Sequence, residues 1–277
     1  MSFDKKGILV ATKHQKEKVI APIFKKYLAC DTFTSEFDTD QLGTFTGEIP
    51  RLKDAMSTCK DKAILAAQLS GHPYALASEG SFGPHPMIPF LPYSQEWMVF
   101  VDLEADICIQ EAIKTQETNY QTKIIEPDVD LTAFLKQVQF PTHGLCLQTS
   151  CLNTVIAKGI QNHKDLQLAL KKGFALDEKL LLSTDMRAMM NPTRMRVIEK
   201  LAEQLALRIL NPCPHCQTPG FGVQGVAGSL ACEQCHWPSA VHAFDVWACV
   251  KCDYQEQRVR ADGKVSIDPQ FCQFCNP

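Results

Sequence analysis

Four Cys-x-x-Cys pairs near the end of the chain constrain its fold more than any other feature of the sequence. Two residues between cysteines form a tight knuckle that points both thiolates at one ion, and two knuckles complete a tetrahedron. Only short apolar segments separate the knuckles, so this region needs metal in order to fold. Residues 211–277 are therefore predicted to form a double zinc ribbon with two structural Zn²⁺ ions. The predicted ligands are Cys213, Cys216, Cys232, Cys235, Cys249, Cys252, Cys272 and Cys275.

The spacing of the pairs also bears on which pairs share an ion. The gaps from Cys216 to Cys232 and from Cys252 to Cys272 match those of zinc ribbons. This favours sequential pairing, in which the first pair joins the second and the third joins the fourth. A crossed arrangement stays open, as do an iron–sulfur cluster and a redox-active dithiol.

The cysteine content and the apolar runs bear on the cellular compartment. No apolar run approaches the ~20 residues that cross a bilayer, and the run at 7–11 is too short for a signal peptide. A cytoplasmic protein without membrane contact is expected. The cytosol keeps thiols reduced, so metal binding rather than disulfides accounts for most of the 13 cysteines. The remaining five are predicted to be buried free thiols: Cys30, Cys59, Cys108, Cys146 and Cys151.

The first 210 residues alternate short apolar runs with amphipathic stretches. Strands are predicted at 8–12, 74–78, 97–101, 144–148 and 179–182, and helices at 16–28, 54–69, 131–138, 164–172 and 192–210. Two segments, 38–50 and 79–92, are predicted to be loops, the second because it holds four prolines and two glycines. Strands that alternate with helices indicate an α/β domain over 1–210, with a mixed, partly parallel sheet flanked by helices.

Charged and hydroxyl side chains gather where the predicted strands end, which is where α/β proteins build their sites. Free amides at a helix start favour anions, lysines suit phosphates, and two carboxylates suit a hydrated Mg²⁺ ion. The alternative is a solvated loop with helix-capping residues. The candidates are Thr12, Lys13 and Lys16 after the first strand, Glu48 before the second helix, Lys62 within it, and Glu79 after the next strand.

Several stretches resemble an uncharacterised bacterial family known only as domain of unknown function 6671. They are the segments 38–51, 77–86, 184–187 and 191–195, together with the terminal cysteine pairs. The resemblance spans nearly the whole chain. It implies no activity.

A fainter resemblance covers about the first hundred residues. Ala11-Thr12 before a lysine-rich helix, Thr44-Phe45 and Glu48 before Lys62-Ala63, and then the segment 77–80 follow the order of motifs in the inosine/xanthosine triphosphate pyrophosphatases. Those enzymes hydrolyse noncanonical nucleoside triphosphates to monophosphates with magnesium.

That second resemblance implies roles for individual residues. Lys13 or Lys16, together with Lys62, would contact phosphates, and Glu48 and Glu79 would hold metal or activate water. The sequence also departs from the pattern. His14 replaces the usual asparagine, the lysine register is shifted, and Glu79 stands alone where many members have paired acids.

Two functions follow from these observations. The first is a magnesium-dependent hydrolase acting on a nucleotide or similar phosphorylated small molecule, with Glu79 and Glu48 as catalytic residues. The alternative is a non-catalytic nucleotide- or protein-binding module whose ribbons dock a protein partner. Nucleic acid is a poor partner, because the chain carries a net charge of −3 and residues 211–277 hold four Lys/Arg against six Asp/Glu.

Overall fold

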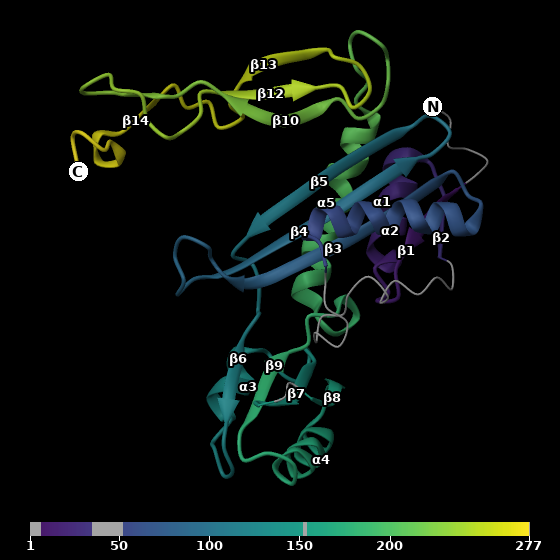
Figure 1. The fold of residues 1–277 in the computed structure, drawn as a ribbon, viewed down its shortest axis with the longest axis vertical. Helices are drawn as coiled ribbons and strands as arrows, with labels where there is room; N and C mark the ends of the chain where they lie inside the picture. The colour runs from purple at the N-terminus through teal and green to yellow at the C-terminus, as the bar shows by residue number, and fades with distance from the viewer. Residues whose placement is uncertain (1–6, 35–51, 152–153, 277) are drawn as a thin grey trace. The chain divides into compact units, whose positions relative to one another are not determined.

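The computed structural model describes residues 7–34, 52–151 and 154–276. The chain divides into two compact units, Ser2–Ala206 and Leu207–Pro277, and the division falls inside helix α5 (Pro192–Leu210) (Figure 1). Within the described ranges, no helix combines the length and apolar character that a membrane span requires.

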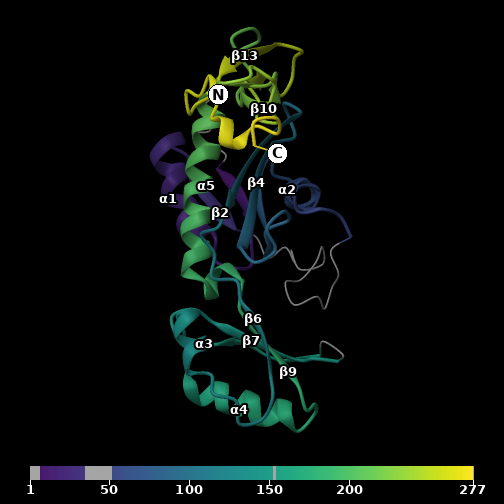
Figure 2. The ribbon, with the colours of Figure 1, turned by 90° about the vertical axis from the view of Figure 1, so that its left-hand side faces the viewer.

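A five-stranded sheet forms the first layer of the unit Ser2–Ala206. Its strand order is β2 (Thr32–Thr34), β1 (Ile8–Ala11), β3 (Tyr74–Pro84), β4 (Pro92–Asp102) and β5 (Ile107–Thr115). Strand β1 is parallel to both β2 and β3, whereas β4 is antiparallel to its two neighbours, β3 and β5. Helix α1 (Glu17–Leu28) and the first part of α5 cover one face, and α2 (Ala55–Ser70) covers the other (Figure 2). This confirms the predicted mixed α/β fold.

Helix α2 packs closely on the sheet because its buried face is made of small residues. Cys59, Ala63, Ala66 and Ala67 form one core cluster with alanines of β3. Asp54 caps the helix, because its carboxylate accepts a hydrogen bond from the Ser57 amide at 3.0 Å. Lys62 lies in the buried part of the same helix, so its side chain is held at the sheet.

The prediction of a loop at 79–92 was wrong in part. Strand β3 continues to Pro84 and β4 begins at Pro92, so only residues 85–91 form the loop of a long hairpin. Pro84 and Pro92 are paired at the end of the ladder, where a missing amide proton costs little. Pairing along both strands outweighs the weak strand propensity of Gly80 and Gly83. Glu79 therefore lies inside strand β3 and not in a loop. The edge strands β2 and β5 were also not predicted.

A second, antiparallel sheet in the same unit has the order β6 (Thr122–Ile125), β9 (Leu180–Thr184), β7 (Leu145–Thr149) and β8 (Val155–Ile160). Helices α3 (Thr132–Gln137) and α4 (His163–Phe174) share one core cluster with its strands, through Phe134, Leu166 and Ala169. The short helix η2 (Ala188–Met190) then leads into α5. The sequence prediction included β7 and β9 but missed β6 and β8.

The unit Leu207–Pro277 is built from two small sheets. Strands β10 (Gly222–Ala227), β12 (Phe244–Ala248) and β13 (Gln255–Val259) are antiparallel. Strands β11 (Ala231–Cys232) and β14 (Ser266–Ile267) form a parallel pair, and the short helix η3 (Pro269–Phe271) follows. The buried Arg208 at the end of α5 donates hydrogen bonds to the carbonyls of Gly220 and Val223 at 3.1 and 3.2 Å.

Candidate functional site

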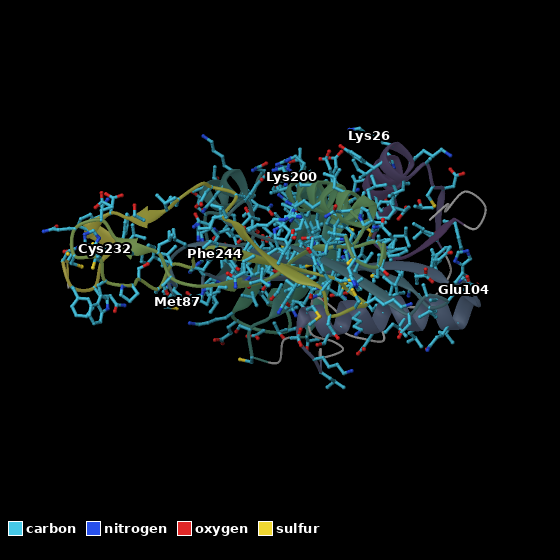
Figure 3. All side chains as sticks on the ribbon, turned by 90° about the horizontal axis from the view of Figure 1, so that it is seen from above. Lys26, Met87, Glu104, Lys200, Cys232 and Phe244 are labelled. Atoms are coloured by element: carbon cyan, nitrogen blue, oxygen red, sulfur yellow. The ribbon has the colours of Figure 1, made fainter. Side chains whose placement is uncertain are left out.

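Eight cysteines form two clusters in the unit Leu207–Pro277. The clusters are Cys213, Cys216, Cys249 and Cys252, and Cys232, Cys235, Cys272 and Cys275; within each, the four sulfurs lie within 4.8 Å of one another. Sulfur separations are 3.8 Å for Cys213–Cys252 and 3.6 Å for Cys216–Cys249. A tetrahedron of ~2.3 Å zinc–sulfur bonds places its sulfurs about 3.8 Å apart. Each cluster therefore fits a zinc-ribbon site, and together the two clusters could hold two zinc ions. Figure 3 labels Cys232, a member of the second cluster.

The predicted sequential pairing of the knuckles was wrong, because the clusters are crossed. Antiparallel pairing of β10 with β12 brings the knuckle before β10 beside the knuckle after β12. Parallel pairing of β11 with β14 places the knuckle that begins at Cys232 beside the one that begins at Cys272. The first pair thus joins the third and the second joins the fourth. Strand pairing, rather than distance along the chain, decides the partners.

Backbone hydrogen bonds shape the knuckles. The amide of Cys213 donates to the carbonyl of Thr218 at 2.8 Å, and that of Cys232 donates to the carbonyl of Trp237 at 3.0 Å. Gln217 and His236 both have φ of 60°, which closes these turns. Hydrogen bonding with Thr218 lowers the pKa of the Cys216 thiol to about 6, which favours the thiolate, the form that binds metal.

The five other cysteines do not all follow the prediction of buried thiols. Cys30, Cys59 and Cys146 are buried. Cys108 is half-buried and Cys151 is exposed, so for these two the prediction was wrong. Burial raises the pKa of the Cys146 thiol to about 12, which makes it a poor nucleophile.

The sequence-predicted lysines Lys16 and Lys62 meet consecutive residues of β3. Lys16 precedes α1 and is buried, and its Nζ donates to the carbonyl oxygen of Ser78 at 2.6 Å. Lys62 forms an ion pair with the carboxylate of Glu79, and the side chains are 7% and 13% exposed. Strand β1 is paired with β3 only as far as Ala11 and Ala77. The two lysines therefore lie just beyond the carboxyl end of β1.

A second buried ion pair borders the same part of β3. Arg194 donates to both carboxylate oxygens of Glu96, at 2.5 and 3.2 Å, and to the carbonyl of Met186 at 2.5 Å. Glu96 is paired across the sheet with Gly80. A Cβ on Gly80 would lie 2.5 Å from the Glu96 carboxylate and 2.7 Å from the Arg194 guanidinium. The absence of a side chain at this position therefore allows the pair to lie against β3, one residue from Glu79.

The two ion pairs and Lys16 form a charge cluster that consists of Lys16, Lys62, Glu79, Glu96 and Arg194. Burial and neighbouring charges shift the pKa of two groups here, Lys16 and His14. Burial, and then the charge of Arg194, lower the pKa of Lys16 to about 8. Burial, and then the charges of Lys16, Arg194 and Arg187, lower the pKa of His14 to about 3, so His14 is neutral at physiological pH. The charges of Lys16, Arg194 and Arg187 thus outweigh the charge of Glu79 in their effect on His14, whereas for Lys16 the carboxylates of Glu79 and Glu96 oppose the effect of Arg194.

Arg187, whose charge also lowers the pKa of His14, forms an ion pair with Asp185 at the end of the second sheet. Asp185 follows β9 and is fully buried, and Arg187 donates to it from Nε at 3.0 Å and from Nη2 at 2.6 Å. Asp185 also accepts a hydrogen bond from the Gly159 amide at 3.0 Å.

Three other residues were predicted to belong to the site: Thr12, Lys13 and Glu48. The hydroxyl of Thr12 accepts a hydrogen bond from the His14 amide at 3.1 Å, which is a local turn contact. Lys13 is exposed. Glu48 lies outside the described residues.

Sequence reasoning missed Glu96 and Arg194. A lone acid within the apolar strand of residues 96–101 was a usable signal for Glu96. Arg194 stands three residues after Asn191, whose side chain caps α5 by accepting from the Arg194 amide at 3.0 Å. Its role depends on a partner 98 residues away along the chain.

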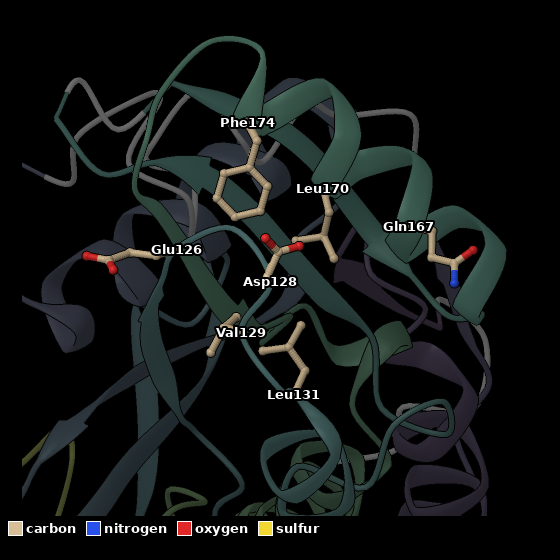
Figure 4. A pocket seen from close by; sticks show the side chains of 7 residues that line it. All are labelled: Glu126, Asp128, Val129, Leu131, Gln167, Leu170 and Phe174. Carbon is tan, nitrogen blue, oxygen red and sulfur yellow. The ribbon is translucent and has the colours of Figure 1, made fainter.

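A separate hollow of about 270 Å³ lies at the second sheet, between the loop after β6 and one side of α4 (Figure 4). Its walls are mainly apolar, and Glu126 at its rim is paired with the exposed Lys179 at 2.8 Å. The lining residues are Glu126, Asp128, Val129, Leu131, Gln167, Leu170 and Phe174. It includes none of the sequence-predicted site residues.

Fold and metal clusters together define an α/β protein with a C-terminal pair of zinc-ribbon-like sites. The model of the family described as "Domain of unknown function (DUF6671)" matches residues 62–277. The chain belongs to this family, as its resemblance predicted. No curated protein matches the sequence.

Proposed function

We propose that the charge cluster beyond β1 binds a phosphate group of a nucleotide or similar small molecule, and that the unit Ser2–Ala206 hydrolyses it. The observation that carries the proposal is Lys16. Its buried ammonium has one hydrogen bond within the described residues, to the neutral carbonyl of Ser78. Glu79 and Glu96 act on this ammonium only from beyond hydrogen-bond contact, so its burial is costly, and a bound anion in direct contact would offset that cost.

Glu79 supports the catalytic part of the proposal. It lies one residue from Ser78, and its ion pair with Lys62 holds the carboxylate in place. In the proposed step a water oxygen forms a bond to phosphorus and the bond to the leaving group breaks, while Glu79 takes the proton of the water. Lys16 and Lys62 offset the negative charge of the phosphate.

The described carboxylates do not fit a magnesium site. Glu79 and Glu96 already neutralise Lys62 and Arg194, and Glu48 lies outside the described residues. The proposed hydrolysis therefore uses no metal ion. The same two ion pairs favour the alternative function, a binding protein without catalysis, because neither carboxylate is free of a cation.

Replacement of Glu79 by Gln is expected to lower the turnover number at least about a hundredfold, because the amide cannot accept the proton. Lys62→Ala should raise the Michaelis constant, since a lysine that faces phosphate acts largely as a point charge, and it should also lower the turnover number, because Glu79 then loses the partner that holds its carboxylate in place. Release of phosphate and pyrophosphate from a panel of nucleotides measures both effects, with and without magnesium.

Glu104→Gln, at an exposed position of the turn after β4, is the matched control and should retain full activity. Equal turnover in wild type and Glu79→Gln would place catalysis elsewhere. A wild type that binds nucleotides but hydrolyses none of them would favour the binding protein.

Anion binding should depend on the protonation of Lys16. With a pKa of about 8, its ammonium is largely present at neutral pH and is lost as the pH rises. Sulfate stays a dianion over this range, so its affinity should be constant below about pH 7 and fall about tenfold per pH unit above 8. Isothermal titration calorimetry measures the affinity. Lys16→Met should lose both the binding and its pH dependence, whereas a Lys16→Met variant that binds sulfate normally would refute the site.

A further inference from the structure

The ribbon unit carries a groove of about 620 Å³ along the extended segment 263–268, which contains β14. The other walls come from Glu233, Val241 and Phe271. Val241 and Ile267 belong to the core around the second cysteine cluster, so the apolar lining continues into that core. This volume is within the range that is typical of ligand-binding sites.

Large apolar side chains are exposed in and near this segment. Val265 and Phe271, which line the groove, are 78% and 70% exposed. On the knuckles of the same cysteine cluster, the rings of Trp237 and Phe274 lie 4.4 Å apart and remain more than half exposed. Exposed apolar groups with a Trp among them are typical of protein interfaces.

Strand β14 offers an open edge beside the groove. It pairs with β11 through Ala231–Ser266 and Cys232–Ile267. Among the strands that the structure describes, none pairs with the other edge of β14. An open edge of this kind accepts an extended peptide through main-chain hydrogen bonds.

The charge of the groove selects among partners. Its lining contains two carboxylates, Glu233 and Asp268, and one cation, Lys264. Glu233 is held in place by the Ser266 hydroxyl, which donates to it at 2.7 Å. The unit Leu207–Pro277 as a whole has six acidic and five basic residues. A partner with basic residues is therefore favoured over anionic partners such as nucleic acid.

We propose that this groove binds an extended segment of a partner protein that adds to the free edge of β14. One apolar side chain of the segment fills the groove between Val265 and Phe271, and a neighbouring Lys or Arg pairs with Glu233. This docking surface is independent of the hydrolase function proposed above.

A library of random dodecapeptides displayed on phage, selected on the zinc-loaded full chain, tests the proposal. Enriched peptides should share an apolar residue beside a Lys or Arg. As synthetic peptides they should bind Val265→Asp at least about tenfold more weakly than wild type, because a carboxylate then faces the apolar side chain. Val226→Asp is the matched control, since Val226 is 59% exposed on β10 of the same unit but does not line the groove.

Two further measurements separate the parts of the proposal. Glu233→Gln keeps the hydrogen-bond acceptor for Ser266 but removes the charge, so it should reduce the salt dependence of binding. Methylation of alternate peptide amides should weaken binding in one register and not in the other, as strand addition requires. Zinc content and circular dichroism check that each variant is folded. Failure to enrich a common sequence, preference for acidic peptides, or equal binding to Val265→Asp would each overturn the proposal.

Discussion

A double variant with Cys213→Ser and Cys249→Ser is expected to retain one zinc ion per chain of the two in the wild type. Both residues belong to one crossed cluster, so their joint loss removes one site and leaves the other with four cysteines. The variant with Cys213→Ser and Cys232→Ser should lose both ions, because each site then lacks a thiolate. Zinc per chain, measured by atomic emission after gel filtration, gives the result.

Sequential pairing predicts another pattern, which makes the experiment decisive. It places Cys213 and Cys232 in one site and Cys249 in the other, so the outcomes of the two double variants would be exchanged. Cys151→Ser is the matched control, because this exposed cysteine belongs to neither cluster and its loss should leave the zinc content unchanged. Absence of zinc from the wild type, or iron with visible absorbance, would contradict the zinc assignment itself.

Arg194→Met should lower the free energy of unfolding by about 3–5 kcal/mol, because it leaves the buried carboxylate of Glu96 without its partner. The side chains of Arg194 and Glu96 are only 7% and 1% exposed, so water cannot take over the role of the guanidinium. Replacing both residues by Met should restore much of the stability, since no charge then remains buried. Urea unfolding followed by circular dichroism measures the change.

The matched control for this prediction lies two residues further along α5. Arg196 is 56% exposed and pairs with Glu117 at 3.7 Å, so Arg196→Met should cost less than about 1 kcal/mol. If Arg194→Met costs as little as this control, the Glu96–Arg194 pair does not hold β4 to α5. A double Met variant no more stable than the single variant would show that the cost arises from lost packing rather than from the unpaired carboxylate.

Local signals in the sequence predicted many individual elements correctly. Asp54 and Asn191 cap α2 and α5, and the sequence indicates the starts of both helices because a cap needs only a side chain and an amide three residues apart. The apolar runs of β1, β7 and β9 were recognised, since they are buried in their sheets. Segments with weak or mixed patterns were missed, among them β5 and the strand portions around the prolines at 84 and 92.

The candidate charge cluster was only partly predictable for a related reason. Lys16 precedes a helix, Lys62 lies within a helix, and Glu79 follows an apolar run. Such positions can be predicted from the sequence alone. Glu96 and Arg194 meet only because α5 packs beside the hairpin of β3 and β4. Gly80 was noticed as a loop residue, but its close approach to this ion pair exists only in the folded sheet.

By itself, the sequence determined which eight cysteines form the candidate metal sites, that the fold is a mixed α/β sheet followed by zinc-ribbon-like sites, and to which family the chain belongs. A Cys-x-x-Cys knuckle and the periodic spacing of apolar residues are local features, so each can be recognised in one short stretch of sequence. Only the tertiary structure decided the crossed sharing of the knuckles and the two buried ion pairs at β3. These depend on the pairing of strands and the packing of helices far apart in the chain, which the spacing of residues along it does not specify.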